Sequence, residues 1–248
     1  MPVYMLTDEL KFPPPEGASP EGVVAIGGDA SPERLALAYS IGIFPWPHRE
    51  LPLLWFSPDP RFVISWDHVH VARSLRKRLR AQPFVVRADT AFSAVIDACA
   101  QAPRPGQDGT WITRELREGF GSLHARGLAH SIEAWDGDRL VGGLYGVALG
   151  RSFCGESMFA HADDASKIAT VALLGNLRTW GFHFIDCQVH TDHLARFGGR
   201  EWPRARFLGA LRRAVAEPSL AGPWRLPLDP LAALAALDEP ISGLPSER

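Results

Sequence analysis

The spacing of hydrophobic residues in the second half of the chain predicts a sheet with one crossing helix. Three successive apolar runs, separated by short turns, predict strands in a meander at residues 129–135, 139–150 and 151–159. Apolar spacing then predicts a helix over 164–181, capped by Asp164 or Ser166 and closed by Gly181. The apolar run FHFIDCQVH at 182–190 predicts a further buried strand. This order of elements favours an α+β or α/β sheet over an all-helical protein.

Proline and glycine interrupt the first sixty residues so often that short elements joined by turns are expected there. One helix is predicted to begin after Ser31, a favourable N-cap that Pro32 follows, and to end at Gly42. Between this region and the meander, the pattern predicts helices over 72–80, 90–100 and 113–127 and a strand over 84–88.

These patterns divide the chain into three parts. We expect a small turn-rich N-terminal domain over residues 1–62 and a second domain over 63–216 that holds the sheet. Residues 217–248 are rich in proline and alanine and end in SGLPSER, which predicts a loosely attached and frayed C-terminal tail.

Composition agrees with a globular protein that has a sizeable core. The chain has 248 residues, 46% hydrophobic and 22% charged, which excludes a disordered or collagen-like protein. Cys99, Cys154 and Cys187 are widely spaced, so a reducing cytoplasm and no structural zinc are expected. The sequence has neither a signal-peptide pattern nor an uncharged apolar run long enough for a membrane span. We therefore expect a cytoplasmic protein without membrane contact.

The net charge of −2 conceals a strongly basic stretch. Residues 61–87 contain seven basic residues and one acidic residue, a net of +6, which leaves −8 for the rest of the chain. Five of these cations belong to the helix predicted at 72–80, namely Arg73, Arg76, Lys77, Arg78 and Arg80. Such a run is either a solvated helix face or a surface for a polyanion, whose phosphates suit arginine.

Polar side chains interrupt the apolar run at 182–190. Because side chains alternate along a strand, Asp186 and Gln188 are expected on one face, ~6.8 Å apart, and Phe184 and His190 share that face. One interpretation is that Asp186 and Gln188 satisfy each other or nearby backbone groups. The other is a pocket in which Asp186 orients Gln188 toward a reacting amine or carbonyl.

Three further residues have a structural and a functional interpretation. Glu156 interrupts the apolar run FCGESMF, where it is either an exposed glutamate on an edge strand or a carboxylate of the same site. Trp46 and Trp111 lie in the loop-like segments GIFPWP and GTWI, where an indole either packs in the core or stacks on a base.

Signatures of several other classes are missing from the sequence. There is no GxSxG nucleophile elbow and no GxGxxG after a strand. His190, Asp192 and His193 match metal-ligand spacing only loosely, so no metal is expected.

Ten blocks follow one another along most of the chain: FPPPEGA, GGDASPERLALAYSIGIFPW, WFSPDPR, RSLRKRLR, GTWI, AHSIEAW, LVGGLYG, FCGESMF, ASK and FIDCQ. In this order they resemble the bacterial leucyl/phenylalanyl-tRNA–protein transferases. The resemblance implies transfer of leucine or phenylalanine from charged tRNA to the α-amino group of proteins that begin with Arg or Lys, which marks them for degradation. Leu-, Phe- and Met-charged tRNAs and such acceptor proteins are the expected partners. We expect no cofactor and favour a monomer.

The resemblance also implies a C-terminal domain like the GNAT acetyltransferase core and a role for each candidate residue. Asp186 and Gln188 would hold and activate the amine, and Glu156 would help position the amine or the aminoacyl group. The expected side-chain pocket consists of Leu144, Phe153, Met158 and Ile185, with Trp46 and Trp111 near the terminal adenosine. The basic helix would bind the acceptor stem of the tRNA through Arg73, Arg76, Lys77, Arg78 and Arg80.

Two alternatives remain open at this point. An acetyl-CoA-dependent acetyltransferase would need a glycine-rich pyrophosphate cradle before the helix at 164–181. The segment there, SMFAHADDASK, has no glycine and contains Asp163 and Asp164, which repel a pyrophosphate. A non-catalytic RNA-binding module would explain the basic helix and the loop tryptophans. It would leave the polar residues of the apolar strands unexplained.

Overall fold

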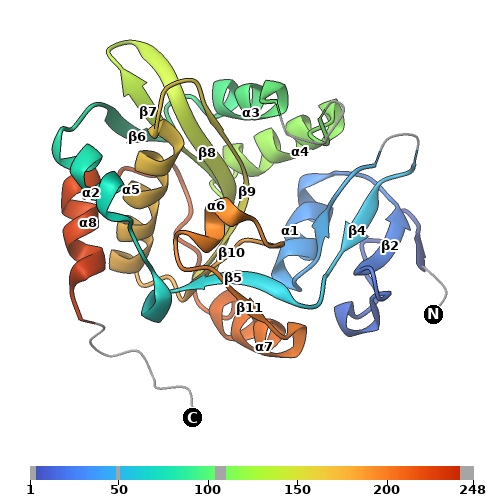
Figure 1. Cartoon of the computed structure of the whole chain (residues 1–248). Helices are drawn as coiled ribbons and strands as arrows, with labels where there is room; N and C mark the ends of the chain where they lie inside the picture. Colours follow the sequence, from blue (N-terminus) through green and yellow to red (C-terminus); the bar gives the residue numbers. More distant parts are fainter. Residues whose placement is uncertain (1–3, 49–50, 104–109, 241–248) are drawn as a thin grey trace.

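The computed structural model describes residues 4–48, 51–103 and 110–240 of the chain (Figure 1). Within these ranges the strands form two sheets, and helices pack around them. The fold is therefore mixed α+β, which confirms the class predicted from the hydrophobic pattern.

The smaller sheet is formed by the N-terminal part of the chain. Its strands are ordered β1 (Tyr4–Leu6), β2 (Val23–Gly27), β4 (Leu54–Phe56) and β3 (Phe44–Pro45). The 3-10 helix η1 (Pro15–Gly17) precedes β2, and α1 (Pro32–Ser40) follows it. Helix α1 begins as predicted, because the Ser31 side chain accepts a hydrogen bond from the Arg34 backbone and Pro32 occupies the first position.

The larger sheet contains the predicted meander. Its strands are ordered β11 (Arg200–Trp202), β5 (Arg61–Ser65), β10 (Phe184–Asp186), β9 (Ser152–Ala160), β8 (Arg139–Leu149), β7 (Ala129–Asp136) and β6 (Val85–Ala88). Strands β7, β8 and β9 pair antiparallel in succession. Strand β10 then pairs parallel with β9 after the chain crosses through α5 (Ala165–Thr179). This crossing places Asp186, the end of β10, next to Cys154, near the start of β9.

Helices cover both faces of the larger sheet (Figure 1). Helix α5 packs on one face, with α2 (Arg73–Arg80) and α8 (Pro230–Asp238) beside it, and α3 (Phe92–Gln101) and α4 (Arg114–Ala125) cover the other. Leu144 and Phe153 pack in the cluster on the α5 side, whereas Tyr145 and Cys154 pack in the cluster on the α3 and α4 side. The remaining helices are η2 (Trp66–His68), α6 (Asp192–Ala195) and α7 (Arg204–Val215). No helix in the described ranges is both long and apolar enough to cross a bilayer.

The prediction of a loosely attached C-terminal tail is wrong for residues 217–240. Trp224 is buried among aromatic residues of the core, and α8 lies along α5. Gly175 allows this close approach, because a side chain there would collide with Ala233 of α8. The Arg178 side chain also donates hydrogen bonds to the carbonyls of Leu237 and Glu239. The small residues of this segment thus serve helix packing, and residues 241–248 lie outside the described ranges.

Candidate active site

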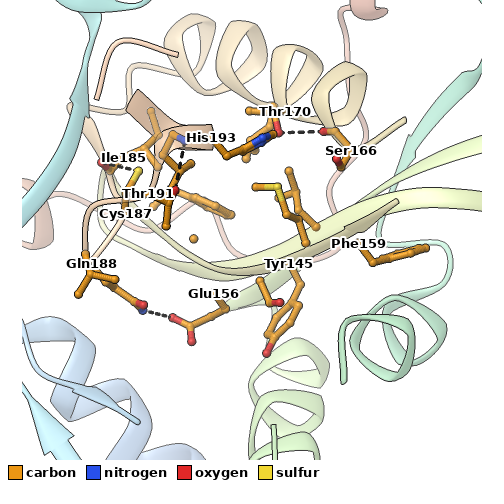
Figure 2. Close-up of a pocket in the computed structure, with 18 of the residues that line it drawn as sticks. Tyr145, Glu156, Phe159, Ser166, Thr170, Ile185, Cys187, Gln188, Thr191 and His193 are labelled. Atoms are coloured by element: carbon orange, nitrogen blue, oxygen red, sulfur yellow. Dashed lines mark hydrogen bonds between the residues drawn. The ribbon is translucent and has the colours of Figure 1, made fainter. Parts of the chain in front are cut away.

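A cavity of about 830 Å³ lies beside the larger sheet, between α5 and the segment that follows β10 (Figure 2). Its size is typical of a small-molecule site. All six predicted substrate-contact residues line it: Trp46, Trp111, Leu144, Phe153, Met158 and Ile185. Glu156 and Gln188 meet at one side of the cavity, and Thr170 and His193 lie toward α5 on the other (Figure 2).

A β-bulge positions Glu156. The pairing of β8 with β9 shifts between Tyr145, which lies opposite Ser157, and Gly146, which lies opposite Gly155. Glu156 is therefore the extra residue of β9, and a bulge of this kind redirects a side chain next to a functional site. Gly146 is required beside the bulge, because a side chain there would collide with the Phe153 ring. The interpretation of Glu156 as an exposed edge-strand glutamate is wrong, since β9 is a central strand and the side chain is buried.

The backbone at Gln188 departs from the predicted strand. Strand β10 ends at Asp186, and Gln188 has a φ of +62°, a left-handed conformation that non-glycine residues rarely adopt. The expected alternation of side chains over 182–190 therefore stops at Asp186. In this conformation the Gln188 side-chain amide donates to Glu156 Oε1 at 2.7 Å, and its backbone N–H donates to Asp186 Oδ1 at 2.9 Å. Such a backbone conformation is maintained by its surroundings, here by these two hydrogen bonds.

Asp186 lies behind the cavity wall rather than in it. Its carboxylate is buried and forms a bidentate ion pair with Arg61, with Nε to Oδ1 at 2.7 Å and Nη2 to Oδ2 at 2.6 Å. The Cys154 thiol lies 3.3 Å from Asp186 Oδ2 and 3.6 Å from Glu156 Oε1, and so links the two carboxyl groups. Asp186 thus contacts Gln188 as predicted, but it is not among the residues that line the cavity.

The environment of Glu156 brings its ionisation into the neutral range. Burial raises the pKa of Glu156 to about 7, and the nearby Asp186 adds to the rise. Hydrogen bonds from Cys154 and Gln188 act in the opposite direction. Near neutral pH this carboxyl group therefore divides between a neutral acid and a carboxylate. A group of that kind both holds a cationic amine and takes up a proton from it.

Sequence comparison identifies the family. The family profile described as "Leucyl/phenylalanyl-tRNA protein transferase" matches residues 63–212, and the profile of its N-terminal domain matches 28–59. The chain belongs to this family. The leucyl/phenylalanyl-tRNA–protein transferase of Myxococcus xanthus is 58% identical over 226 residues, which cover 90% of this chain and 97% of the relative. Those of Anaeromyxobacter dehalogenans strain 2CP-C and Nitratidesulfovibrio vulgaris strain DP4 are 55% and 54% identical, with 91% and 92% of this chain and 97% and 98% of the relative covered.

The basic helix of this transferase-family chain lies outside the cavity. In α2, Leu75 and Leu79 are buried, as helical spacing requires, and the cations Arg73, Lys77, Arg78 and Arg80 are exposed. Arg76 differs from them, because it is half-buried and forms a bidentate ion pair with Asp238 of α8 at 2.6 and 2.7 Å. None of the five lines the cavity.

Several residues of this site escaped sequence analysis. Arg61 belongs to the basic stretch of the sequence, and its burial follows from pairing with the distant Asp186. Tyr39 and Cys154 carry no motif, since helix and strand packing alone bring them to Glu156.

The three residues with loose metal-ligand spacing do not form a cluster. His190 lies edge-on to Phe62, and His193 lies edge-on to Phe197. Among the described residues no group of three or more His, Cys, Asp or Glu side chains is arranged to hold a metal ion.

Proposed function

We propose that this chain transfers leucine, phenylalanine or methionine from charged tRNA to the α-amino group of proteins that begin with Arg or Lys, and so marks those proteins for degradation. One observation carries the proposal in addition to family membership. A largely apolar cavity contains the hydrogen-bonded side chains of Glu156 and Gln188, with the Asp186–Arg61 ion pair behind them. This arrangement suits an apolar aminoacyl side chain and a reacting amine.

The reaction needs alignment and the movement of one proton. The amine nitrogen forms a bond to the ester carbonyl carbon, and the bond from that carbon to the ribose oxygen breaks. The released ribose oxygen takes up the proton that the amine loses and becomes a hydroxyl. Alignment alone contributes ~7–11 kcal/mol to such a step. In our proposal Glu156 holds the amine, Gln188 orients it and stabilises the developing charge, and Asp186 acts through Gln188 as its electrostatic support.

Leu144, Phe153, Met158 and Ile185 are the proposed pocket for the aminoacyl side chain. An apolar pocket discriminates by only ~1–3 kcal/mol for each methylene, so similar unbranched or γ-branched side chains are accepted together. We propose that Trp46 and Trp111 stack on the terminal adenosine, a contact worth ~1–3 kcal/mol per base.

The exposed cations of α2, with Arg76 beside them, are the proposed contact for the acceptor stem. Phosphate contacts carry no sequence information, so one surface serves several tRNAs. These phosphate contacts predict that tRNA binding weakens as the salt concentration rises.

We further propose that the larger sheet and its helices are related to the GNAT acetyltransferase core, with the chain divided into domains at residues 1–62 and 63–216. The antiparallel meander, the crossing through α5 and the parallel pair of β9 and β10 support this relation. We also propose a cytoplasmic location and a monomeric state.

A transfer assay tests the function. The protein is incubated with labelled Leu-tRNA and a peptide that begins with Arg, and a matched peptide that begins with Ala is the control. We expect label in the Arg peptide alone. Failure to label it, or equal labelling of both peptides, would overturn the proposal. Asp186→Ala and Gln188→Ala then test the assigned roles, and full activity in both variants would remove them.

A further inference from the structure

Arg61, the first residue of β5, is a buried cation, and each of its three side-chain nitrogens donates a hydrogen bond. Its side chain is 1% exposed. Nε and Nη2 donate to the two oxygens of Asp186, and Nη1 donates to the Gly42 carbonyl at 3.2 Å. A buried guanidinium is tolerated only where a counter-ion and hydrogen bonds replace water, so this geometry is strongly constrained.

Aromatic rings on two other parts of the chain hold the Arg61 guanidinium. The Phe44 ring of β3 lies 4.8 Å from its central carbon, and the Phe207 ring of α7 lies 4.5 Å from it. The smaller sheet, β5 and helix α7 therefore meet at one side chain. Strand β3 leads directly to Trp46, which lines the cavity.

Hydrogen bonds connect Arg61 to the reacting end of the cavity in three steps. Asp186 Oδ1 accepts from Arg61 at 2.7 Å and from the Gln188 backbone at 2.9 Å. The Gln188 side chain then donates to Glu156 at 2.7 Å. Because one carboxylate oxygen accepts both bonds, the orientation of the guanidinium fixes the left-handed turn at Gln188.

We propose that Arg61 is a positioning residue for aminoacyl transfer: it orients the Asp186 carboxylate, which holds Gln188 against Glu156, and it joins this network to the segment that carries Trp46. This inference rests on the proposed function.

Removal of Arg61 also changes the charge balance of the site. The titratable groups that face Asp186 and Glu156 are Arg61 from β5, Tyr39 from α1, Tyr145 from β8, Cys154 from β9 and Cys187 after β10. Arg61 is the cation of this set. Without it two buried carboxyl groups face each other without a counter-charge, and such a pair holds a shared proton to higher pH.

The test compares Arg61→Met with Arg34→Met. Arg34 is a matched control, since it is equally buried and donates to the Thr7 and Glu9 carbonyls away from the cavity. We expect Arg61→Met to lower kcat ~100-fold with a nearly unchanged KM for charged tRNA, as a misplaced reacting group does. The pH midpoint of kcat should move upward. Arg34→Met should keep both the kcat and the pH midpoint of the unmodified protein.

Two further variants test whether the loss of kcat comes from the bidentate geometry and acts through Asp186. Arg61→Lys, which keeps the charge but not the bidentate geometry, should restore part of kcat and the pH midpoint. In an Asp186→Asn background, Arg61→Met should cause little further loss, because the residue acts through Asp186. A full additional loss there would overturn the proposal.

The outcomes separate this inference from the proposed function. If the unmodified protein transfers no label, the function fails whatever the variants do. If it is active and Arg61→Met keeps its kcat and pH midpoint, the positioning role fails. Should Arg61→Met not fold, as judged by circular dichroism, Arg61→Lys decides, and an unchanged kcat in that variant would overturn the proposal.

Discussion

Two charged regions of this protein contain the same residue types, but one region is buried and the other is exposed to solvent. Around Glu156, the charged groups are buried, and each one contacts the next through hydrogen bonds of fixed geometry. Along α2, four cations project into solvent, while Leu75 and Leu79 are buried against the core. The first region sets the geometry and proton affinity of a reaction, and the second supplies a charged surface.

The difference predicts how each region responds to mutation. Buried groups with shared partners are coupled, so the loss of one disturbs the others and effects are large and non-additive. Exposed cations interact weakly with one another through water, so their losses are small, additive and sensitive to salt.

The largest effect is expected for Gln188→Ala. The variant loses the amide that contacts Glu156, and we expect kcat to fall ~100–1,000-fold, as for loss of one preorganised donor. Gln82→Ala is the matched control, because Gln82 is also a glutamine at positive φ but is exposed and away from the cavity. Equal kcat values for the two variants in the peptide assay would contradict the assigned role.

A pH profile is the next test, and its sign follows from burial. Since the pKa of Glu156 is raised to about 7, the group is a neutral acid below this pH and a carboxylate above it. With saturating acceptor peptide, kcat should therefore rise with pH and have a midpoint near 7. Glu156→Gln should lower kcat ~100-fold and abolish that midpoint.

Glu133→Gln is the control for this profile. Glu133 is a fully buried glutamate on β7 that accepts hydrogen bonds from Thr90 and Ser131 and does not line the cavity. We expect a lower melting temperature for this variant with the pH midpoint of the unmodified protein. A Glu156→Gln enzyme that retains the midpoint would show that another group titrates.

A smaller effect is expected on α2. Lys77→Ala with Arg80→Ala should raise KM for charged tRNA and lower the slope of log KM against log salt by about 1.5, with kcat preserved. Arg114→Ala, which removes an exposed arginine paired with Glu118 on α4, is the control and should leave the salt slope unchanged. A salt slope that is equal in the double variant and the unmodified protein would exclude phosphate contacts by α2.

The smallest effect concerns Asp238. This carboxylate pairs with Arg76 at the edge of the cationic face and competes with a phosphate for it. Asp238→Ala should lower KM for charged tRNA ~2-fold, in keeping with the small energy of an exposed ion pair. A raised KM would show that the ion pair instead holds Arg76 in its binding position.

Periodicity in the sequence predicted most elements that local patterns determine. The meander over β7, β8 and β9 and the cap of α1 at Ser31 are confirmed, because strand alternation and helix capping depend on neighbouring residues. The six pocket residues rested on resemblance to a family, and they line the cavity. Their contacts with substrate stay a prediction.

The parts that escaped prediction depend on distant segments. Nothing local marks the bulge at Glu156, since it arises from the pairing of β8 with β9. Arg61 pairs with a residue 125 positions later, so the charge count over 61–87 did not reveal its burial. The proline- and alanine-rich composition of the C-terminal segment predicted a frayed tail. In the structure, however, Ala233 packs closely against α5 because Gly175 has no side chain. Each of these features is set by tertiary packing that overrides the local pattern.

The bulge in β9 has a consequence for how this family can vary. Glu156 takes no part in the ladder of strand partners, because the residues on either side of it pair with β8. Its side chain can therefore be exchanged without the loss of a cross-strand pair, and the sheet neither requires nor forbids a carboxylate there. At this position the side chain can therefore change without a change in the fold. A relative with another side chain at the bulge would keep the architecture and offer a different reaction.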